Sequence, residues 1–315
     1  MSNRIVFLDL ARVIALLLVV FGHLYPSGSD VNLYIYAFHM PFFFLVSGYL
    51  HRNAETVPLI LKMAKRMLVP FCFFIVIGYL YFVVKNHSLS LDTLYNTARN
   101  IVYGKSITAN VIIWFLLAMF FVRILGNFFI KQPKYWSVPI ILLFVLFVVA
   151  RKNYFFLGSA MMAMPFYLAG YYGRRIIDAA VNNRYGVLIG LLCLIATIAI
   201  SSINGKVSMM GFRFGRTSYE WLNMVLFYSN GIIGSLMLLC FSGLIKKESK
   251  LVKLVSRCSI SIVGFQAIPI RLWGSYAGPD SGYGVSILFS VFVVACCVGF
   301  HLMVEKKANW LLGGR

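Results

Sequence analysis

The sequence is poor in charge, and above all in negative charge. Only 9 of its 315 residues are Asp or Glu, and charged residues make up 12% of the chain, against about 25% in soluble domains. Hydrophobic residues reach 61%, and the mean hydropathy is +0.84. A soluble core of this length cannot bury so much apolar surface, so lipid must solvate most of the chain. These proportions exclude a soluble enzyme or binding module.

Cysteine motifs are also missing. The six cysteines lie in or beside apolar segments, and none forms a C-x-x-C pair or has His or Asp at metal-ligand spacing. We interpret them as small hydrophobic residues of the helix bundle. We therefore expect neither a disulfide nor a metal site.

The shortage of acid leaves 29 Lys and Arg residues and a formal charge of +20. These bases cluster in short loops between apolar runs, where positive charge sets membrane topology. Topology therefore accounts for the charge better than nucleic-acid binding, which would come first in a soluble chain. We expect no nucleic-acid partner.

Apolar runs of about 17–25 residues, the length that crosses a bilayer, predict an all-α integral membrane protein with about ten transmembrane helices. The loops on the same face of the membrane as the N-terminus hold about twice as many Lys and Arg residues as the loops on the opposite face. Because positive loops stay in the cytoplasm, this bias predicts that both termini are cytoplasmic. We expect residues 1–315 to form one multi-pass domain of the inner or plasma membrane, without a soluble appendage or cleaved signal. The predicted spans are residues 5–25, 33–51, 66–85, 111–130, 137–152, 154–173, 186–203, 222–245, 254–273 and 285–304.

The first apolar run contains three polar residues, Asp9, Arg12 and His23. A charge at mid-bilayer costs at least about 2.5–3.5 kcal/mol, so such residues usually mark function. At 100° per residue, His23 returns to within roughly 20° of Arg12, and the helical rise separates them by about 16 Å. The structural explanations are an i,i+3 ion pair for Asp9 and Arg12 and an interfacial position for His23. The shared face favours function.

Three motifs resemble those of acyltransferase family 3 membrane proteins. RIVFLDLARVIALLLVVFGH (residues 4–23) is similar to the opening signature, including the ten residues between Arg12 and His23. FHMPFFFLVSGYL (38–50) is similar to the Phe-His-Met-Pro segment, most of all that of fucose O-acetylase-like members. KMAKRMLVPF (62–71) is similar to a basic loop leading to Leu-x-Pro. The resemblance is strong over residues 4–71 and diffuse afterwards.

The resemblance implies a membrane O-acyltransferase. Its acyl group, usually acetyl, would come from acetyl-CoA as co-substrate and pass to a hydroxyl of a cell-surface or lipid-linked glycan, as in polysaccharide modification. A polytopic small-molecule transporter is the alternative, since many spans and intramembrane charge also suit transport. A non-catalytic sensor or scaffold is a third interpretation. The lack of paired inverted halves argues against the transporter.

The predicted catalytic base is His23. An alcohol is a poor nucleophile until its proton is removed, and neutral imidazole, with a pKa of about 6.5, suits that task. A carboxylic acid or a carbonyl usually orients such a base, and among the carboxylates Glu220 is preferred to Asp30 or Asp280. The predicted catalytic residues are His23, Arg12, Asp9 and Glu220.

The predicted binding residues lie in the second and ninth spans and in the basic segment that leads into the third span. The CoA phosphates would meet cytoplasmic cations, namely Lys62, Lys65 and Arg66, with Arg12 as a further candidate. The acceptor would meet His39, Ser47, Gly48, Tyr49 and Gln266. For His39 three roles stay open: orienting His23, binding the acceptor, or capping a helix broken by Pro41. Gln266 stands where many family members have a Tyr-x-x-His-type segment, and glutamine cannot act as a base.

Overall fold

A computed structural model describes residues 6–25, 29–87, 91–107, 110, 112–247, 249–276 and 282–314. Every regular element within these ranges is a helix, and β pairing there is limited to one isolated bridge between Ser208 and Arg213. The predicted all-α class is therefore confirmed.

Seven helical segments of the described chain are long and apolar enough to cross a membrane. They are Val6–His23, Asp30–Tyr49, Thr56–Asn86, Trp114–Lys131, Gly186–Asn204, Glu220–Ser242 and Gly282–Leu312. A bent pair, Lys250–Arg257 and Ser259–Gly274, meets at 55° and would make an eighth. The multi-pass membrane class is thus supported, whereas the count of ten and the cytoplasmic termini stay predictions.

The remaining predicted spans, 137–152 and 154–173, correspond to shorter helices. The first is α8 (Pro133–Phe144) continued by the π-helical turn η2 (Val145–Val149), and the second is α9 (Leu157–Tyr172). Each is shorter than the roughly 20 residues of an ordinary transmembrane helix.

The chain folds into two compact units, each assembled from segments that lie far apart in the sequence. Unit 1 comprises Met1–His51, Pro165–Ser259 and Ala277–Val294, and unit 2 comprises Arg52–Met164, Ile260–Tyr276 and Ala295–Arg315. The expectation of a single functional domain over residues 1–315 stays a prediction.

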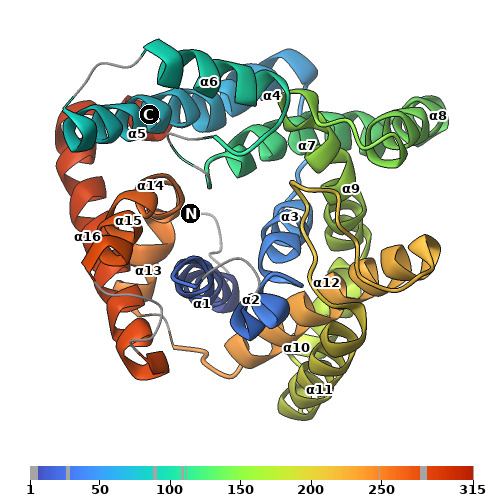
Figure 1. Ribbon diagram of the computed structural model, residues 1–315. Coiled ribbons are helices and arrows are strands. Elements are labelled where there is room, and N and C mark those ends of the chain that lie inside the picture. The colour runs from blue at the N-terminus through green and yellow to red at the C-terminus, as the bar shows by residue number, and fades with distance from the viewer. Residues whose placement is uncertain are drawn as a thin grey trace. The chain divides into compact units, whose positions relative to one another are not determined.

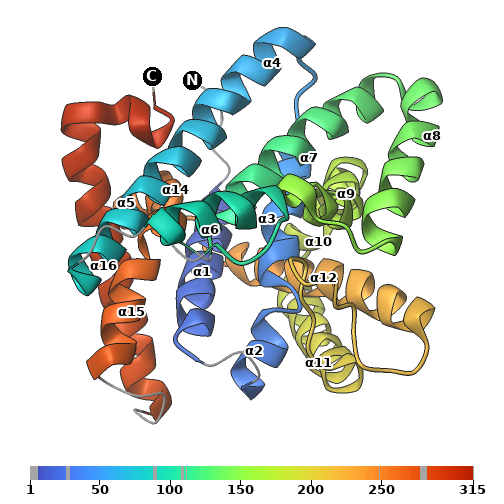
Figure 2. The ribbon, with the colours of Figure 1, turned by 45° about the horizontal axis from the view of Figure 1, so that its top comes forward.

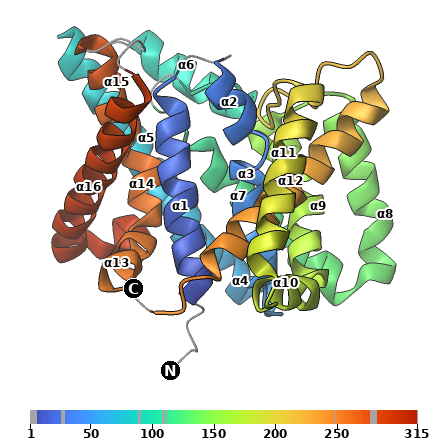
Figure 3. The ribbon, with the colours of Figure 1, turned by 90° about the horizontal axis from the view of Figure 1, so that it is seen from below.

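Unit 1 is built around α1 (Val6–His23). The other helices of the unit are α2 (Asp30–Ile35), α3 (His39–Tyr49), the second half of α9, α10 (Arg174–Val181), α11 (Gly186–Asn204), α12 (Glu220–Ser242), α13 (Lys250–Arg257) and the first part of α16 (Gly282–Ala308). Helix α1 packs against α2, α3, α12 and α13, with α13 near its N-terminal end and α2 near its C-terminal end (Figures 1 and 3). Ala11, Ala15 and Leu16 are fully buried on α1, and small residues let neighbouring helices approach closely.

The second predicted span is a broken helix. Helix α2 ends at Ile35, and α3 begins at His39, after three residues that are not helical. Pro41 lies in the first turn of α3, where its missing N–H would have no partner within the helix.

The α3 backbone touches the backbone of the second half of α9. A Cβ on Gly48 would lie 1.8 Å from the Tyr167 carbonyl oxygen, and one on Gly170 would lie 1.9 Å from the Leu45 carbonyl oxygen. Only glycine fits at both positions, so the close approach expected at Gly48 is observed, and it is to another helix.

Arg174, the first residue of α10, holds the C-terminal end of α3. Its guanidinium donates to the carbonyl oxygens of Tyr49 at 2.6 Å, of Gly48 at 3.3 Å and of His51. The last carbonyls of a helix lack intrahelical donors and carry partial negative charge, so a cation stabilises them. The Tyr49 hydroxyl donates to Asp178 Oδ1 at 2.5 Å and ties the same two helices together.

Unit 2 contains one long helical segment where a basic loop was expected. Helix α4 (Thr56–Met63), the π-helical turn η1 (Ala64–Leu68) and α5 (Val69–Asn86) follow one another without interruption (Figure 2). The predicted loop of residues 52–65 is therefore wrong from Thr56 onwards, whereas residues 52–55 are not helical. In a regular helix the ring of Pro70 would clash with the carbonyl of residue i−4, and the wide turn lies directly before this proline.

Besides α8, η2 and the first half of α9, unit 2 contains further helices. They are α6 (Leu91–Val102), α7 (Trp114–Lys131), the 3₁₀ turn η3 (Tyr154–Phe156), nearly all of α14 (Ser259–Phe265), α15 (Ala267–Tyr276), the end of α16 (Gly282–Ala308) and η4 (Asn309–Leu312). Helices α7 and α15 and the turn η4 pack against α5. The side-chain amide of Asn127 on α7 exchanges two hydrogen bonds with the Ala54 backbone, at 3.2 and 3.3 Å.

Candidate active site

Two imidazoles and a phenol meet where α1 ends and α3 begins. His23 is the last residue of α1, His39 is the first of α3, and Tyr36 lies in the break before α3. The Tyr36 hydroxyl is 3.2 Å from His23 Nδ1, and the Tyr36 ring lies 5.8 Å from the His23 ring and 4.9 Å from the His39 ring between centroids. The structure thus brings together two of the predicted site residues, both from unit 1.

The role of His39 follows in part from its hydrogen bond. Its Nδ1 lies 2.8 Å from the Ile35 carbonyl oxygen, the last carbonyl of α2. A carbonyl only accepts, so Nδ1 carries the proton and Nε2 of the neutral ring is the lone-pair nitrogen. Capping of the broken helix, one of three roles left open, is therefore observed. Binding of the acceptor through Nε2 stays a prediction.

Among the described residues, the hydrogen bond of His23 is to the phenol of Tyr36, and none to a carboxylate is seen there. Glu220 is the exposed first residue of α12, and Asp30 is the first residue of α2. Asp280 lies outside the described residues. The predicted roles of these carboxylates stay predictions.

Tyr36 is the residue that sequence reasoning missed. Its signal is local: a tyrosine three residues before His39, in a segment that Pro41 was expected to interrupt. Tyr36 lies in the break between α2 and α3, and from there its hydroxyl reaches His23 at the end of α1.

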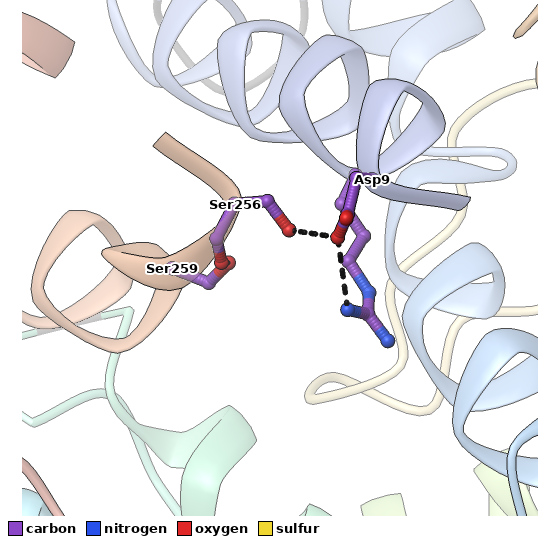
Figure 4. Close-up of polar contacts among 4 residues, drawn as sticks. Asp9, Ser256 and Ser259 are labelled. Atoms are coloured by element: carbon purple, nitrogen blue, oxygen red, sulfur yellow. Dashed lines mark hydrogen bonds and ion pairs between the residues drawn. The ribbon is translucent and has the colours of Figure 1, made fainter. Parts of the chain in front are cut away.

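Asp9 and Arg12 lie at the other end of α1. Ser256 on α13 donates from its hydroxyl to Asp9 Oδ1 at 2.6 Å, and Arg12 Nη1 is 3.7 Å from the same oxygen (Figure 4). Asp9 is only 7% exposed, and a buried carboxylate without partners costs several kcal/mol. The i,i+3 ion pair considered as the structural explanation is therefore present, and Asp9 also joins α1 to α13. Catalytic roles for Asp9 and Arg12 stay predictions.

The predicted acceptor contacts Ser47, Gly48 and Tyr49 lie in the last turns of α3. As described above, Gly48 packs on Tyr167 and the Tyr49 hydroxyl binds Asp178. Ser47 is half-buried. The structure thus assigns packing functions to two of the three, and their contact with an acceptor stays a prediction.

The predicted phosphate-binding cations lie in unit 2. Lys62, Lys65 and Arg66 are exposed side chains of α4 and η1. The segment Thr56–Asn86 has 31 residues and is therefore about 46 Å long, whereas the hydrocarbon core is about 30 Å thick. The segment is thus longer than the hydrocarbon core is thick, and the three cations lie in its N-terminal half. Phosphate binding there stays a prediction.

Gln266 lies in unit 2 at the junction of α14 and α15 and is fully buried. Its Nε2 is 3.5 Å from the Val263 carbonyl oxygen, and its Oε1 has no hydrogen-bond partner among the described residues. Buried polar groups normally have partners. An acceptor contact at Gln266 stays a prediction.

The chain is thus a polytopic helical membrane protein with an imidazole cluster at one end of its first helix. A family model described as an acyltransferase domain, that of acyltransferase family 3, matches residues 5–303. The chain belongs to this family and is a membrane acyltransferase. Neither curated proteins nor solved structures give a match. The family match extends the resemblance far beyond residues 4–71, and the fucose O-acetylase-like subgroup stays a prediction.

Proposed function

We propose that this acyltransferase moves an acetyl group from acetyl-CoA to a hydroxyl of a cell-surface or lipid-linked glycan, with His23 as the general base. The observation that carries the proposal is the contact between His23 and Tyr36 at the end of α1. A base needs a partner that fixes the orientation of its ring, and Tyr36 supplies one.

The proposed reaction is a direct acyl transfer. His23 Nε2 takes the proton of the acceptor hydroxyl, and the freed oxygen attacks the thioester carbonyl carbon. The new ester C–O bond forms, the C–S bond of acetyl-CoA breaks, and the CoA thiolate receives the proton from the imidazolium. Atoms and charge balance without a metal or a redox partner.

Donor and acceptor would approach from opposite membrane faces. With the N-terminus in the cytoplasm, the CoA phosphates would meet the cations of α4 and η1, Lys62, Lys65 and Arg66, on that side. Arg12 would be a further contact of the phosphates, and its distance of about 16 Å from His23 along α1 is within reach of an extended pantetheine arm, roughly 15–20 Å long. This topology is part of the proposal.

The test uses the full chain in lipid nanodiscs with acetyl-labelled acetyl-CoA and a panel of glycan acceptors. General-base catalysis contributes about 100- to 10,000-fold, so His23→Gln should lower labelled-ester formation at least about 100-fold. The matched control is His87→Gln, because His87 is an exposed histidine just after α5. A folded His23→Gln protein with wild-type rate would contradict the proposed base.

The transporter alternative predicts a different result. Solute would enter proteoliposomes without release of free CoA thiol, whereas acyl transfer releases one thiol for each ester formed. Mass spectrometry of cell glycans, with and without the His23 variant, then identifies the acceptor from the lost acyl mass.

A further inference from the structure

Tyr36 has one hydroxyl proton and two polar neighbours on α1. Its oxygen lies 3.2 Å from His23 Nδ1 and 3.5 Å from the Gly22 carbonyl oxygen. The ring packs closely on the helix end, since a Cβ on Gly22 would lie 3.1 Å from Tyr36 Cε1. This proximity fixes where the phenol can donate and accept.

One proton arrangement uses both contacts. The carbonyl of Gly22 can only accept, so the phenol donates to it, and the phenol oxygen then accepts from a protonated His23 Nδ1. In the reverse arrangement the phenol donates its proton to Nδ1 of His23. The Gly22 carbonyl then receives no hydrogen bond from the phenol, and the hydrogen of the neutral imidazole is on Nε2. Only the first arrangement leaves a lone pair on Nε2.

We propose that Tyr36 is a positioning residue that holds His23 as the Nδ1–H tautomer and so presents Nε2 as the basic nitrogen. Its effect on rate rests on the proposed function, but the tautomer itself does not. His39 is held in the same tautomer by the Ile35 carbonyl, so in both imidazoles of the cluster Nε2 would carry the lone pair.

The first measurement is the tautomer of His23, by nitrogen NMR of histidine-labelled protein in nanodiscs. The wild type should show a protonated Nδ1, and Tyr36→Phe should convert it to a mixture of tautomers. The matched control is Tyr34→Phe, two residues away, because the Tyr34 hydroxyl lies 3.5 Å from Ser202 instead. This variant should leave the His23 signals unchanged.

The second measurement is acyl transfer by the same proteins. Tyr36→Phe should lower kcat about tenfold with little change in KM for acetyl-CoA, and Tyr34→Phe should not. A wild-type His23 protonated on Nε2, or a Tyr36→Phe protein with unchanged tautomer and kcat, would overturn the proposal. If the wild type transfers no acyl group but shows the Tyr36-dependent tautomer, the positioning role is supported and the proposed function fails.

A second inference comes from α6, whose amphipathicity is inverted. Leu91, Leu94, Tyr95 and Val102 lie within an arc of about 100° on the helix, and their exposed fractions are 80%, 50%, 66% and 39%. The neighbouring polar residues Thr93 and Thr97 are buried. The apolar side of α6 therefore faces away from the rest of unit 2.

The surroundings of α6 identify what covers this side. Helix α5 ends only five residues earlier and exposes Val76, Leu80 and Val84, which in a membrane helix must face lipid. Beyond α6, Tyr103 lies 6.0 Å from Tyr154 between ring centroids, and both rings are exposed. Tyrosines gather at the membrane–water boundary. We infer that α6 lies in the interfacial layer of the bilayer, with its Leu and Tyr side chains in the acyl–headgroup boundary.

The test places a genetically encoded spin label at position 94 or at position 96 of the full chain in nanodiscs. A spin label at position 94 should be more accessible to oxygen, which dissolves in lipid, than to a water-soluble nickel chelate. Position 96, about 160° around the helix, should show the reverse. Equal nickel accessibility at both positions would overturn the inference, and so would short label-to-label distances between two copies, which would place a second chain on this side.

Discussion

Replacement of Gly48 by alanine places a methyl group where α3 crosses α9. The new carbon would lie 1.8 Å from the Tyr167 carbonyl oxygen, whereas an ordinary close C···O contact is about 3.3 Å. The two helices must therefore separate by about 1.5 Å to restore that contact distance. The obstacle is a backbone atom, which cannot rotate away as a flexible side chain would.

The cost can be worked from opposing effects. Overpacking of a close-packed core costs about 1–3 kcal/mol, sometimes more, and a rigid backbone obstacle favours the upper end. Alanine in place of glycine within a helix returns roughly 0.5–1 kcal/mol. We expect Gly48→Ala to lower the free energy of unfolding by about 2 kcal/mol.

The assay is the half-life of the folded protein in mild detergent at a fixed elevated temperature, because membrane proteins of this size unfold irreversibly. Gly299→Ala is the matched control, since it also lies within a helix and a Cβ there meets no atom within 4 Å. The control should be as stable as the wild type or more so. Equal half-lives for Gly48→Ala and wild type would refute the helix contact.

Three further predictions concern other contacts of unit 1. Ser256→Ala should shorten the same half-life, because the buried Asp9 carboxylate loses a hydrogen bond that contributes about 1.5–3 kcal/mol, whereas Ser256→Thr should keep it. Arg174→Lys should also destabilise the protein, since an ammonium cannot reproduce the planar guanidinium that binds two α3 carbonyls. A variant that melts at the same temperature as the wild type would contradict this prediction. His39→Asn should melt like the wild type, because its amide can still donate to the Ile35 carbonyl, whereas His39→Leu should melt earlier.

The sequence predicted best what depends on local pattern. The membrane class follows from composition, and the ion pair between Asp9 and Arg12 follows from helical periodicity. The close approach at Gly48 was also expected, because a missing side chain has a direct steric meaning. Each of these inferences needs only one helix.

What the sequence did not reveal depends on how helices are interrupted. Lys65, Arg66 and Pro70 together resembled a loop, whereas one wide turn lets the helix continue through them. A carboxylate was the expected partner of His23, since that is the usual chemical choice. Tyr36 was not expected because its position depends on the break between α2 and α3, and periodicity does not encode that geometry.

The wide turn at Ala64–Leu68 also affects how this chain should be aligned with its relatives. Such a turn accommodates one residue more than an α-helical turn, and one residue corresponds to a rotation of about 100°. A relative with one residue fewer here, and with another residue in place of Pro70, would keep both α4 and α5 as a single regular helix. If the gap were placed elsewhere, every position between the gap and the turn would be matched to the wrong side of the helix, with lipid-facing residues compared against buried ones.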